Sequence, residues 1–411
     1  MEKMRFLSVG LRALTLASKF SLIFFLAKFL SVADVGVYGL LVAVLGYGIY
    51  LIGLDFYTFS SRELIASEIG RRYGIIKNQF AVYMVWYLLS LPAVLILDHY
   101  GLIPRGYVGW VVCLLILDHL GQELNRILIA LHQQVFAAVV LFIRTGIWGI
   151  VVAITQWLVP GARSVAFVLD AWVIGCTIAC VLALTRLWPL IPRGHPAKLD
   201  MRWIAGGLAI AVPFFVASMA VRGMATFDRY MVENAAGLEL LGVYVVFAGM
   251  ATAVISFVDA AVVDFSYPKL VALARKNDYP AFLLEFRRTA KLILFIGVVL
   301  ALAAGAGGAT LIGFFDDSQY RENIYILYCL LVVSSISIAS VIPHLGLYAM
   351  GIDGPIVRSQ IAGFLLFVLV SLIFADRLGL DAVLAGLIAG WSCIFIWKWI
   401  AYRSVAPRSA N

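Results

Sequence analysis

Residues 213–244 read PFFVASMAVRGMATFDRYMVENAAGLELLGVY. An apolar helix that contains Arg222 is followed by a short polar segment and by a second apolar helix, which opens at residues 242–244. An arginine inside a membrane span costs roughly 3 kcal/mol near the bilayer centre on insertion scales, so it usually faces water or a charged partner. Ser218, Arg222 and Arg229 recur at helical spacing and share one face. The stretch therefore predicts two membrane helices with a polar face turned away from lipid.

The rest of the composition agrees with a membrane protein. Apolar residues make up 63% of the 411 residues and charged residues only 13%, about half the charge of a soluble chain. The apolar runs are long enough to cross a bilayer core of about 30 Å as helices. They do not alternate in the way that barrel strands do. The sequence therefore predicts an all-α membrane protein.

The apolar runs and the loops between them predict a topology. Basic residues concentrate in alternate loops, so those loops and both termini are predicted to be cytoplasmic. This bias accounts for the net charge of +8 without a nucleic-acid partner. Twelve spans are predicted, at residues 9–29, 37–60, 79–98, 107–130, 136–158, 164–185, 203–225, 240–263, 290–314, 324–349, 358–376 and 381–401.

The chain is also predicted to contain an internal repeat. The tripeptide Gly-Val-Tyr opens the second span at residues 36–38 and the eighth span at residues 242–244. Because each half holds an even number of spans, the two halves would be parallel repeats around a central cavity. We therefore predict an N-terminal six-helix lobe at residues 1–188, a cytoplasmic linker at 189–202 and a C-terminal six-helix lobe at 203–411.

Charged residues inside the predicted spans or close to their ends are the candidate functional groups. Arginine binds phosphate oxygens in pairs and lysine binds them as a point charge, so basic side chains around a cavity suit an anionic substrate. The alternative for Arg222 is a buried ion pair that only holds helices together, and Lys28, near the outer end of its span, could instead extend to the interface. The basic candidates are Lys19, Lys28, Arg144, Arg222 and Arg229, and the acidic ones are Asp55, Asp118, Glu123 and Asp259.

One group of ionisable residues has two open interpretations. His119, Glu123 and Arg126 follow one another at helical spacing in the fourth span. They would form either a proton relay or a neutralised network that packs helices together. The five cysteines lie inside spans and are interpreted as small core residues, so no metal site and no catalytic residue is predicted.

Two sets of short motifs resemble a known family. The first lies at residues 33–40 (ADVGVYGL), 54–56 (LDF) and 61–63 (SRE), and the second at 227–230 (FDRY), 242–244 (GVY) and 267–270 (YPKL). With the predicted topology, they resemble the polysaccharide-transporter branch of the multidrug/oligosaccharidyl-lipid/polysaccharide (MOP) exporter superfamily, and within it the Wzx-type O-antigen and capsule flippases. The lipid II flippases of that superfamily carry two further spans, which this chain lacks.

That resemblance implies a function. A flippase of this kind moves an oligosaccharide linked to undecaprenyl pyrophosphate across the bacterial inner membrane by alternating access, for the synthesis of O-antigen lipopolysaccharide, capsule or exopolysaccharide. It implies no cofactor, leaves coupling to a proton or sodium gradient open, and implies membrane lipids and other polysaccharide-assembly proteins as partners.

The resemblance also suggests roles for the charged candidates. The pyrophosphate is expected to bind Lys19, Arg144 and Arg222, and Lys28 and Arg229 would receive the head group on release. The four acids would bind a coupling cation or balance the basic charges.

Two other functions stay open. A cation-coupled drug exporter of the same superfamily is disfavoured by the basic cavity, because typical substrates of such exporters are cationic. A membrane enzyme of polysaccharide assembly, such as a polymerase or ligase, usually needs a sizeable external loop, and the predicted topology has none.

Overall fold

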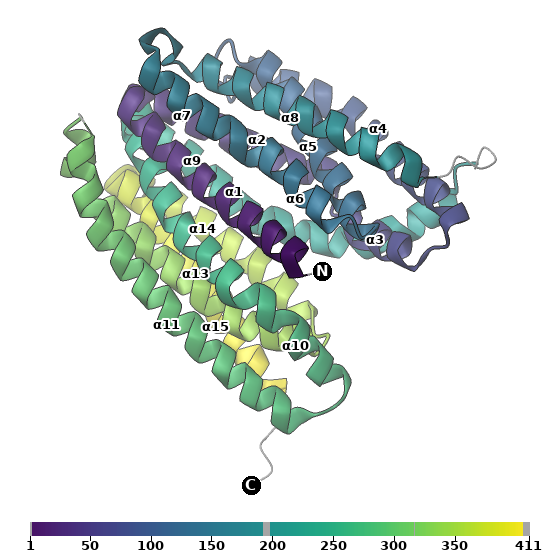
Figure 1. The fold of residues 1–411 in the computed structure, drawn as a ribbon. Helices are drawn as coiled ribbons and strands as arrows, with labels where there is room; N and C mark the ends of the chain where they lie inside the picture. Colours follow the sequence, from purple (N-terminus) through teal and green to yellow (C-terminus); the bar gives the residue numbers. More distant parts are fainter. Residues whose placement is uncertain (1, 192–197, 316, 406–411) are drawn as a thin grey trace. The chain divides into compact units, whose positions relative to one another are not determined.

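Every element of the protein is a helix in the computed structural model, which describes residues 2–191, 198–315 and 317–405, with side chains from residue 10 onward (Figure 1). No strand occurs among these residues, so the predicted all-α class is confirmed. The chain forms two compact units, residues 1–219 and 220–411. The predicted linker at 189–202 lies partly outside the described residues, which omit 192–197.

The first unit contains eight α-helices and the start of a ninth. They are α1 (Glu2–Phe29), α2 (Val32–Gly53), α3 (Tyr57–Ala66), α4 (Arg72–His99), α5 (Val108–Ala130), α6 (Gln134–Phe142), α7 (Trp148–Leu158), α8 (Val165–Leu187) and the first part of α9 (Met201–Val258). A π-helical turn, η2 (Ile143–Ile147), joins α6 to α7. The rings of Phe56 and Phe59 pack on Trp203, which fixes the beginning of α9 to this unit.

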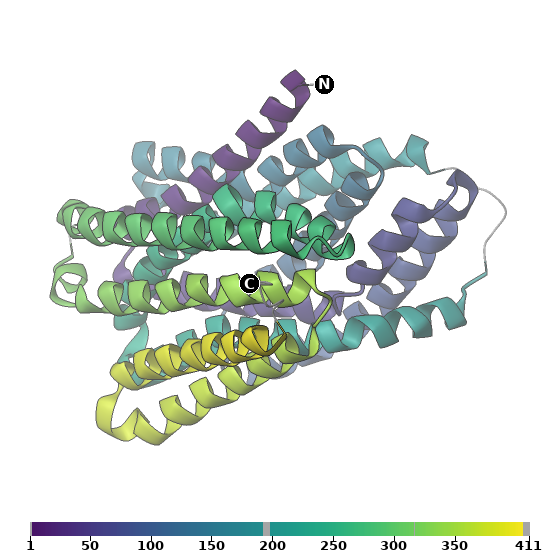
Figure 2. The same cartoon turned by 90° about the horizontal axis from the view of Figure 1, so that it is seen from below.

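The second unit contains the rest of α9 and the remaining helices. They are η5, a π-helical turn (Asp259–Val263), α10 (Asp264–Arg275), α11 (Tyr279–Leu311), α12 (Gln319–Glu322), α13 (Tyr325–Ala349), α14 (Gly354–Leu378) and α15 (Leu380–Val405). Figure 2 shows α14 and α15 lying side by side. Their backbones approach closely at Gly363 and Gly390, where a Cβ on either residue would lie 2.7 Å from the other's carbonyl oxygen.

Ten helical stretches of the described chain are long and apolar enough to cross a membrane. Two features explain the difference from the twelve predicted spans. Helix α5, which carries Asp118, His119, Glu123 and Arg126, is not among the ten, and the seventh and eighth spans fall in one stretch, Met201–Arg275. All twelve predicted segments are helical, but the second is not continuous. It was predicted at 37–60, whereas α2 ends at Gly53 because Leu54 and Asp55 adopt left-handed backbone angles.

Two motifs from the sequence have clear local roles. Ser31 caps α2 by accepting a hydrogen bond from the Asp34 amide (3.1 Å), and its hydroxyl donates to the Asp34 carboxylate (2.7 Å). Within α9, the Tyr244 hydroxyl donates to the Asp228 carboxylate over 2.6 Å. Sixteen residues of straight helix would span about 24 Å, so the chain must fold back between these two residues.

The fold-back occurs at Gly237, which has φ 80° and ψ 175°. Only glycine adopts this conformation readily, and strained backbone of this kind costs another residue on the order of 1–3 kcal/mol. Replacing Gly237 with Ala is therefore expected to lower the melting temperature, although nothing lies within 4 Å of the added Cβ. The matched control is Gly206→Ala, which is equally open but helical and should be neutral or stabilising. Equal melting temperatures for the two variants would contradict this account.

Candidate functional site

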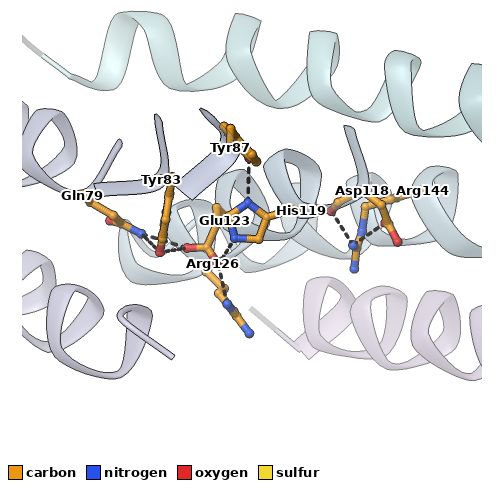
Figure 3. A network of polar contacts seen from close by, with 8 residues as sticks. All are labelled: Gln79, Tyr83, Tyr87, Asp118, His119, Glu123, Arg126 and Arg144. Carbon is orange, nitrogen blue, oxygen red and sulfur yellow. Dashed lines mark hydrogen bonds and ion pairs between the residues drawn. The ribbon is translucent and has the colours of Figure 1, made fainter. Parts of the chain in front are cut away.

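Helix α5 buries a row of polar side chains inside the first unit (Figure 3). Asp118, His119 and Glu123 are all buried on this helix, and Arg126 follows one turn later. Lipid offers no hydrogen bonds to such groups, so each must find its partner within the protein. The partners come from α3, α4, α8 and η2.

Glu123 is the centre of the larger cluster. Its side chain is completely buried, and its Oε2 atom accepts hydrogen bonds from Gln79 Nε2 (2.8 Å) and Tyr83 Oη (2.7 Å) on α4. Its Oε1 atom accepts a hydrogen bond from Arg126. The Arg126 guanidinium in turn lies over the Tyr57 ring of α3, 3.3 Å from its centroid. The carboxylate is thus held by three donors, and its charge is balanced within the first unit (Figure 3).

His119 joins this cluster through one ring nitrogen only. Its Nδ1 atom is 2.7 Å from Tyr87 Oη, and either atom is the donor, depending on the tautomer. Its Nε2 atom is buried, lies 4.0 Å from Glu123 Oε1 and has no hydrogen-bond partner among the described residues. Gly53 permits this position, because a Cβ there would approach Nε2 to 3.2 Å.

A second buried ion pair lies one turn away on α5. Arg144 donates from its NH1 atom to the Asp118 carboxylate (2.7 Å) and to the Asp118 carbonyl oxygen (3.1 Å). Arg144 sits in the π-helical turn η2, a kind of helix distortion that is frequent at functional sites. Gly121 makes room for it, since a Cβ there would lie 2.9 Å from Arg144 Cδ. In this structure the charge of Arg144 is therefore balanced locally.

The other predicted basic residues differ in their surroundings. Lys19 and Lys28 are exposed side chains of α1 in the first unit, and Arg222 is an exposed side chain of α9 in the second. Arg229 is half-buried and pairs with Asp228, at 3.2 Å between NH1 and Oδ1. Of the five predicted basic residues, three therefore have exposed side chains, Arg229 is half-buried and Arg144 is buried.

The predicted acids also fall into two groups. Asp118 and Glu123 each pair with an arginine, as described above. Asp55 is buried at the break between α2 and α3, and its backbone is left-handed (φ 49°). Asp259 begins the π-helical turn η5 and is half-buried within electrostatic range of Asp264. Among the described residues no group of three or more His, Cys, Asp or Glu side chains could hold a metal ion.

Sequence reasoning missed the neutral members of the network. Gln79, Tyr83 and Tyr87 lie on one face of α4 at a spacing of four residues, and this polar row in an otherwise apolar span is the signal that could have identified them. Tyr57 gave no such signal, because its contact with Arg126 depends on the bend between α2 and α3.

Comparison with known proteins shows which fold this is. No family model and no curated protein sequence matches the chain. Among solved structures, an inward-facing multidrug resistance MATE family transporter of the MOP superfamily is similar, with a TM-score of 0.73, 14% identity and coverage of 96% of both chains.

Two further structures agree with this result. The MATE multidrug transporter DinF-BH has a TM-score of 0.64 and 16% identity, with coverage of 98% of this chain and 95% of its own. A mutant of the Vibrio cholerae MATE transporter VcmN has a TM-score of 0.54 and 13% identity, with coverage of 100% of this chain and 99% of its own. The chain therefore has the fold of these multi-pass membrane proteins over nearly its whole length.

Proposed function

We propose that this protein is a transporter that moves an oligosaccharide, linked to a prenyl pyrophosphate lipid, across the bacterial inner membrane. Its fold is shared with transporters of the MOP superfamily, and the short motifs described above resemble the polysaccharide-transporter branch. The observation that carries the proposal is the presence of exposed basic side chains within apolar helices, at Lys19 and Arg222.

The physical argument concerns what such side chains can face. Lys19 lies near the middle of the candidate span Gly10–Phe29. A lysine or arginine at this depth costs about 3 kcal/mol if it faces lipid, so a water-filled surface is the favourable environment. A water-filled surface with fixed positive charges attracts an anion, and a pyrophosphate group offers the oxygens that both side chain types bind.

Different basic residues would take different parts in transport. Lys19 and Arg222 would contact the pyrophosphate, and Lys28, close to the end of α1, would receive it on release. Arg144 and Arg229 pair with Asp118 and Asp228 in this structure, so they would join the substrate only after an exchange of partners. Asp55 and Asp259 would bind a coupling proton or sodium ion or balance the basic charge.

The proposal places both termini in the cytoplasm, where basic loops are favoured. Lipid-linked oligosaccharides would then be loaded on that side and released on the other by alternating access. The proteins that make the lipid-linked repeat unit and those that consume it would be functional partners. No enzymatic step is assigned to this chain.

The test is a lipid-flipping assay with purified protein in liposomes. Replacing Lys19 or Arg222 with Ala removes one charge-assisted contact, worth about 1.5–3 kcal/mol, so flipping of a prenyl-pyrophosphate glycan should fall roughly 10- to 100-fold. Lys19→Arg and Arg222→Lys should retain part of the activity. Arg105→Ala, an exposed residue outside the helices, is the control. Unchanged flipping in both alanine variants, at normal protein levels, would reject the proposal.

Drug export is the second candidate, because the similar structures are described as multidrug transporters. The two functions respond differently to the same variants. A cationic dye is repelled by Arg222, so Arg222→Ala would leave dye efflux unchanged or increase it. Efflux of a cationic dye by the wild-type protein, without glycolipid flipping, would favour drug export.

A further inference from the structure

A lysine is buried in the second unit at a position that the substrate proposal does not use. Lys398 lies on α15 and is only 3% exposed. It continues a buried stripe of this helix, in which residues follow one another every four positions at Gly386, Gly390, Ile394, Lys398 and Tyr402. The neighbours on either side of it in the stripe are packed within the second unit, Ile394 against Gly363 of α14 and Tyr402 against Gly346 of α13. Lys398 is therefore enclosed by helices and is not a snorkelling surface residue.

This lysine has no acidic partner. Among the described residues, no carboxylate lies within ion-pair distance of Lys398, and no side-chain hydrogen bond to it is formed. Glu123, Arg144 and Asp228 are also strongly buried, and each has a partner of opposite charge, whereas the buried Asp55 forms no ion pair among the described residues. Burying an unpaired ionised group costs several kcal/mol. Such a group in a membrane protein points to a functional site.

The titratable groups found within electrostatic range of Lys398 and of Tyr402 add no negative charge. His344 of α13 lies within electrostatic range of it. The Tyr348 ring stacks on His344, with centroids 6.0 Å apart and planes 12° apart. Arg287 of α11 lies within electrostatic range of Tyr402, the next residue of the buried stripe. The surroundings of Lys398 are therefore basic or neutral on α11, α13 and α15, and they would stabilise an anion.

An open groove runs along one face of α10 in the same unit. It has a volume of about 510 Å³ and is lined by Tyr267, Pro268, Val271, Ala272, Arg275 and Lys276. The Tyr267 ring lines the groove and also packs on the Tyr348 ring, with centroids 5.4 Å apart. Arg275 and Lys276 are exposed at the rim. Ring contacts from Tyr267 through Tyr348 to His344 thus place this groove close to His344, the residue of α13 that lies within electrostatic range of Lys398.

We propose that Lys398 and His344 form an anion-binding site in the second unit that takes a phosphate or pyrophosphate group from the side of the α10 groove. Lysine supplies a point charge, and histidine and tyrosine supply further hydrogen-bond donors, which together suit phosphate oxygens. The basic rim would draw the anion in, and the buried lysine would hold it after the loss of its hydration shell. The site is additional to Lys19 and Arg222.

Two kinds of ligand carry a phosphate or pyrophosphate group: a free anion and a lipid head group. If the ligand is a prenyl pyrophosphate lipid, which rests on the proposed function, this is the site where cargo is first held before translocation. The basic loops on either side of α10 and α11 would place it at the cytoplasmic surface. If the ligand is free pyrophosphate or phosphate, the site regulates the protein without carrying cargo.

Thermal unfolding of the full-length protein in detergent tests the site without any transport measurement. A ligand that binds only the folded state raises the melting temperature as its concentration increases. Inorganic pyrophosphate should therefore stabilise the wild type, and this response should disappear in Lys398→Met and weaken in His344→Gln.

Lys398→Met should also melt higher than wild type without ligand, because an apolar side chain of similar length replaces an unpaired buried charge. Lys398→Arg keeps the charge and should keep part of the response.

Two comparisons complete the experiment. Lys198→Met removes an exposed lysine of the first unit, and it should leave both the melting temperature and the pyrophosphate response unchanged.

Farnesyl pyrophosphate is compared with inorganic pyrophosphate, and farnesol controls for the prenyl chain. Stabilisation by the prenyl pyrophosphate alone identifies a lipid head group, and equal stabilisation identifies a free anion. A wild type that responds to neither probe, or an equal response in Lys398→Met, overturns the proposal, whereas failed flipping alone leaves it standing.

Discussion

Replacing Arg144 with Met is expected to destabilise the protein by about 3–5 kcal/mol, the usual cost of removing one partner of a buried ion pair. The Asp118 carboxylate would stay buried after losing the hydrogen bond of 2.7 Å that balances its charge. Asp118 is near Cys176, at 3.7 Å from Oδ1 to Sγ, but a thiol is only a weak donor and does not replace a guanidinium. Denaturant or thermal unfolding of the purified protein measures this loss.

A double variant separates the cost of an orphaned charge from the value of the pair. Arg144→Met combined with Asp118→Leu removes both charges, and an apolar pair of similar volume is often as stable as a buried ion pair. The double variant should therefore recover most of the stability that Arg144→Met loses. Arg105→Met, at an exposed position outside the helices, is the matched control and should be neutral. If Arg144→Met unfolds like wild type, the buried pair does not stabilise the first unit.

Glu123→Ala is the second change with a large expected effect. It leaves three buried or half-buried donors without their acceptor, on Gln79, Tyr83 and Arg126. Each unsatisfied neutral donor costs about 1–3 kcal/mol, and a charged one costs more. We therefore expect a loss of several kcal/mol, seen as poor yield of folded protein and a much lower melting temperature.

The controls for this prediction use the same chemistry. Glu123→Gln keeps an acceptor oxygen for the α4 donors but loses the charge opposite Arg126, so its loss should be smaller than that of Glu123→Ala. Glu322→Ala removes an exposed carboxylate and should have no measurable effect. A Glu123→Ala protein with the stability of the Glu322→Ala protein would show that the network in Figure 3 does not hold the helices together.

The helices were largely predictable because hydropathy is a local property. Runs of apolar residues gave all twelve helical segments, and the acidic and basic residues of α5 were recognised as membrane-buried. The single break that was missed, after Gly53, depends on left-handed angles at Leu54 and Asp55. These are not glycines, so the sequence carried no local sign of the turn.

The partners of the buried charges were far less predictable. The spacing of His119, Glu123 and Arg126 was visible, because residues three and four apart share a helix face. The pairing of Arg144 with Asp118, 26 residues earlier, was not visible, since it depends on how two helices pack. Lys398 was not singled out, because it lies near the end of the predicted span at 381–401, where a lysine can extend to the interface; its burial became known only from the structure.

The sequence by itself determined that this chain is a helical membrane protein with charged side chains inside its spans. Length, hydropathy and helical spacing are enough for that, because they act within a few turns of one helix. Only the tertiary structure decided which of those charges are balanced by a neighbour, as at Arg144 and Arg229, and which are buried without one among the described residues, as at Asp55 and Lys398. The physical reason is that a charge in an apolar medium is governed by the groups within a few ångströms of it, and helix packing brings those groups together from distant parts of the chain.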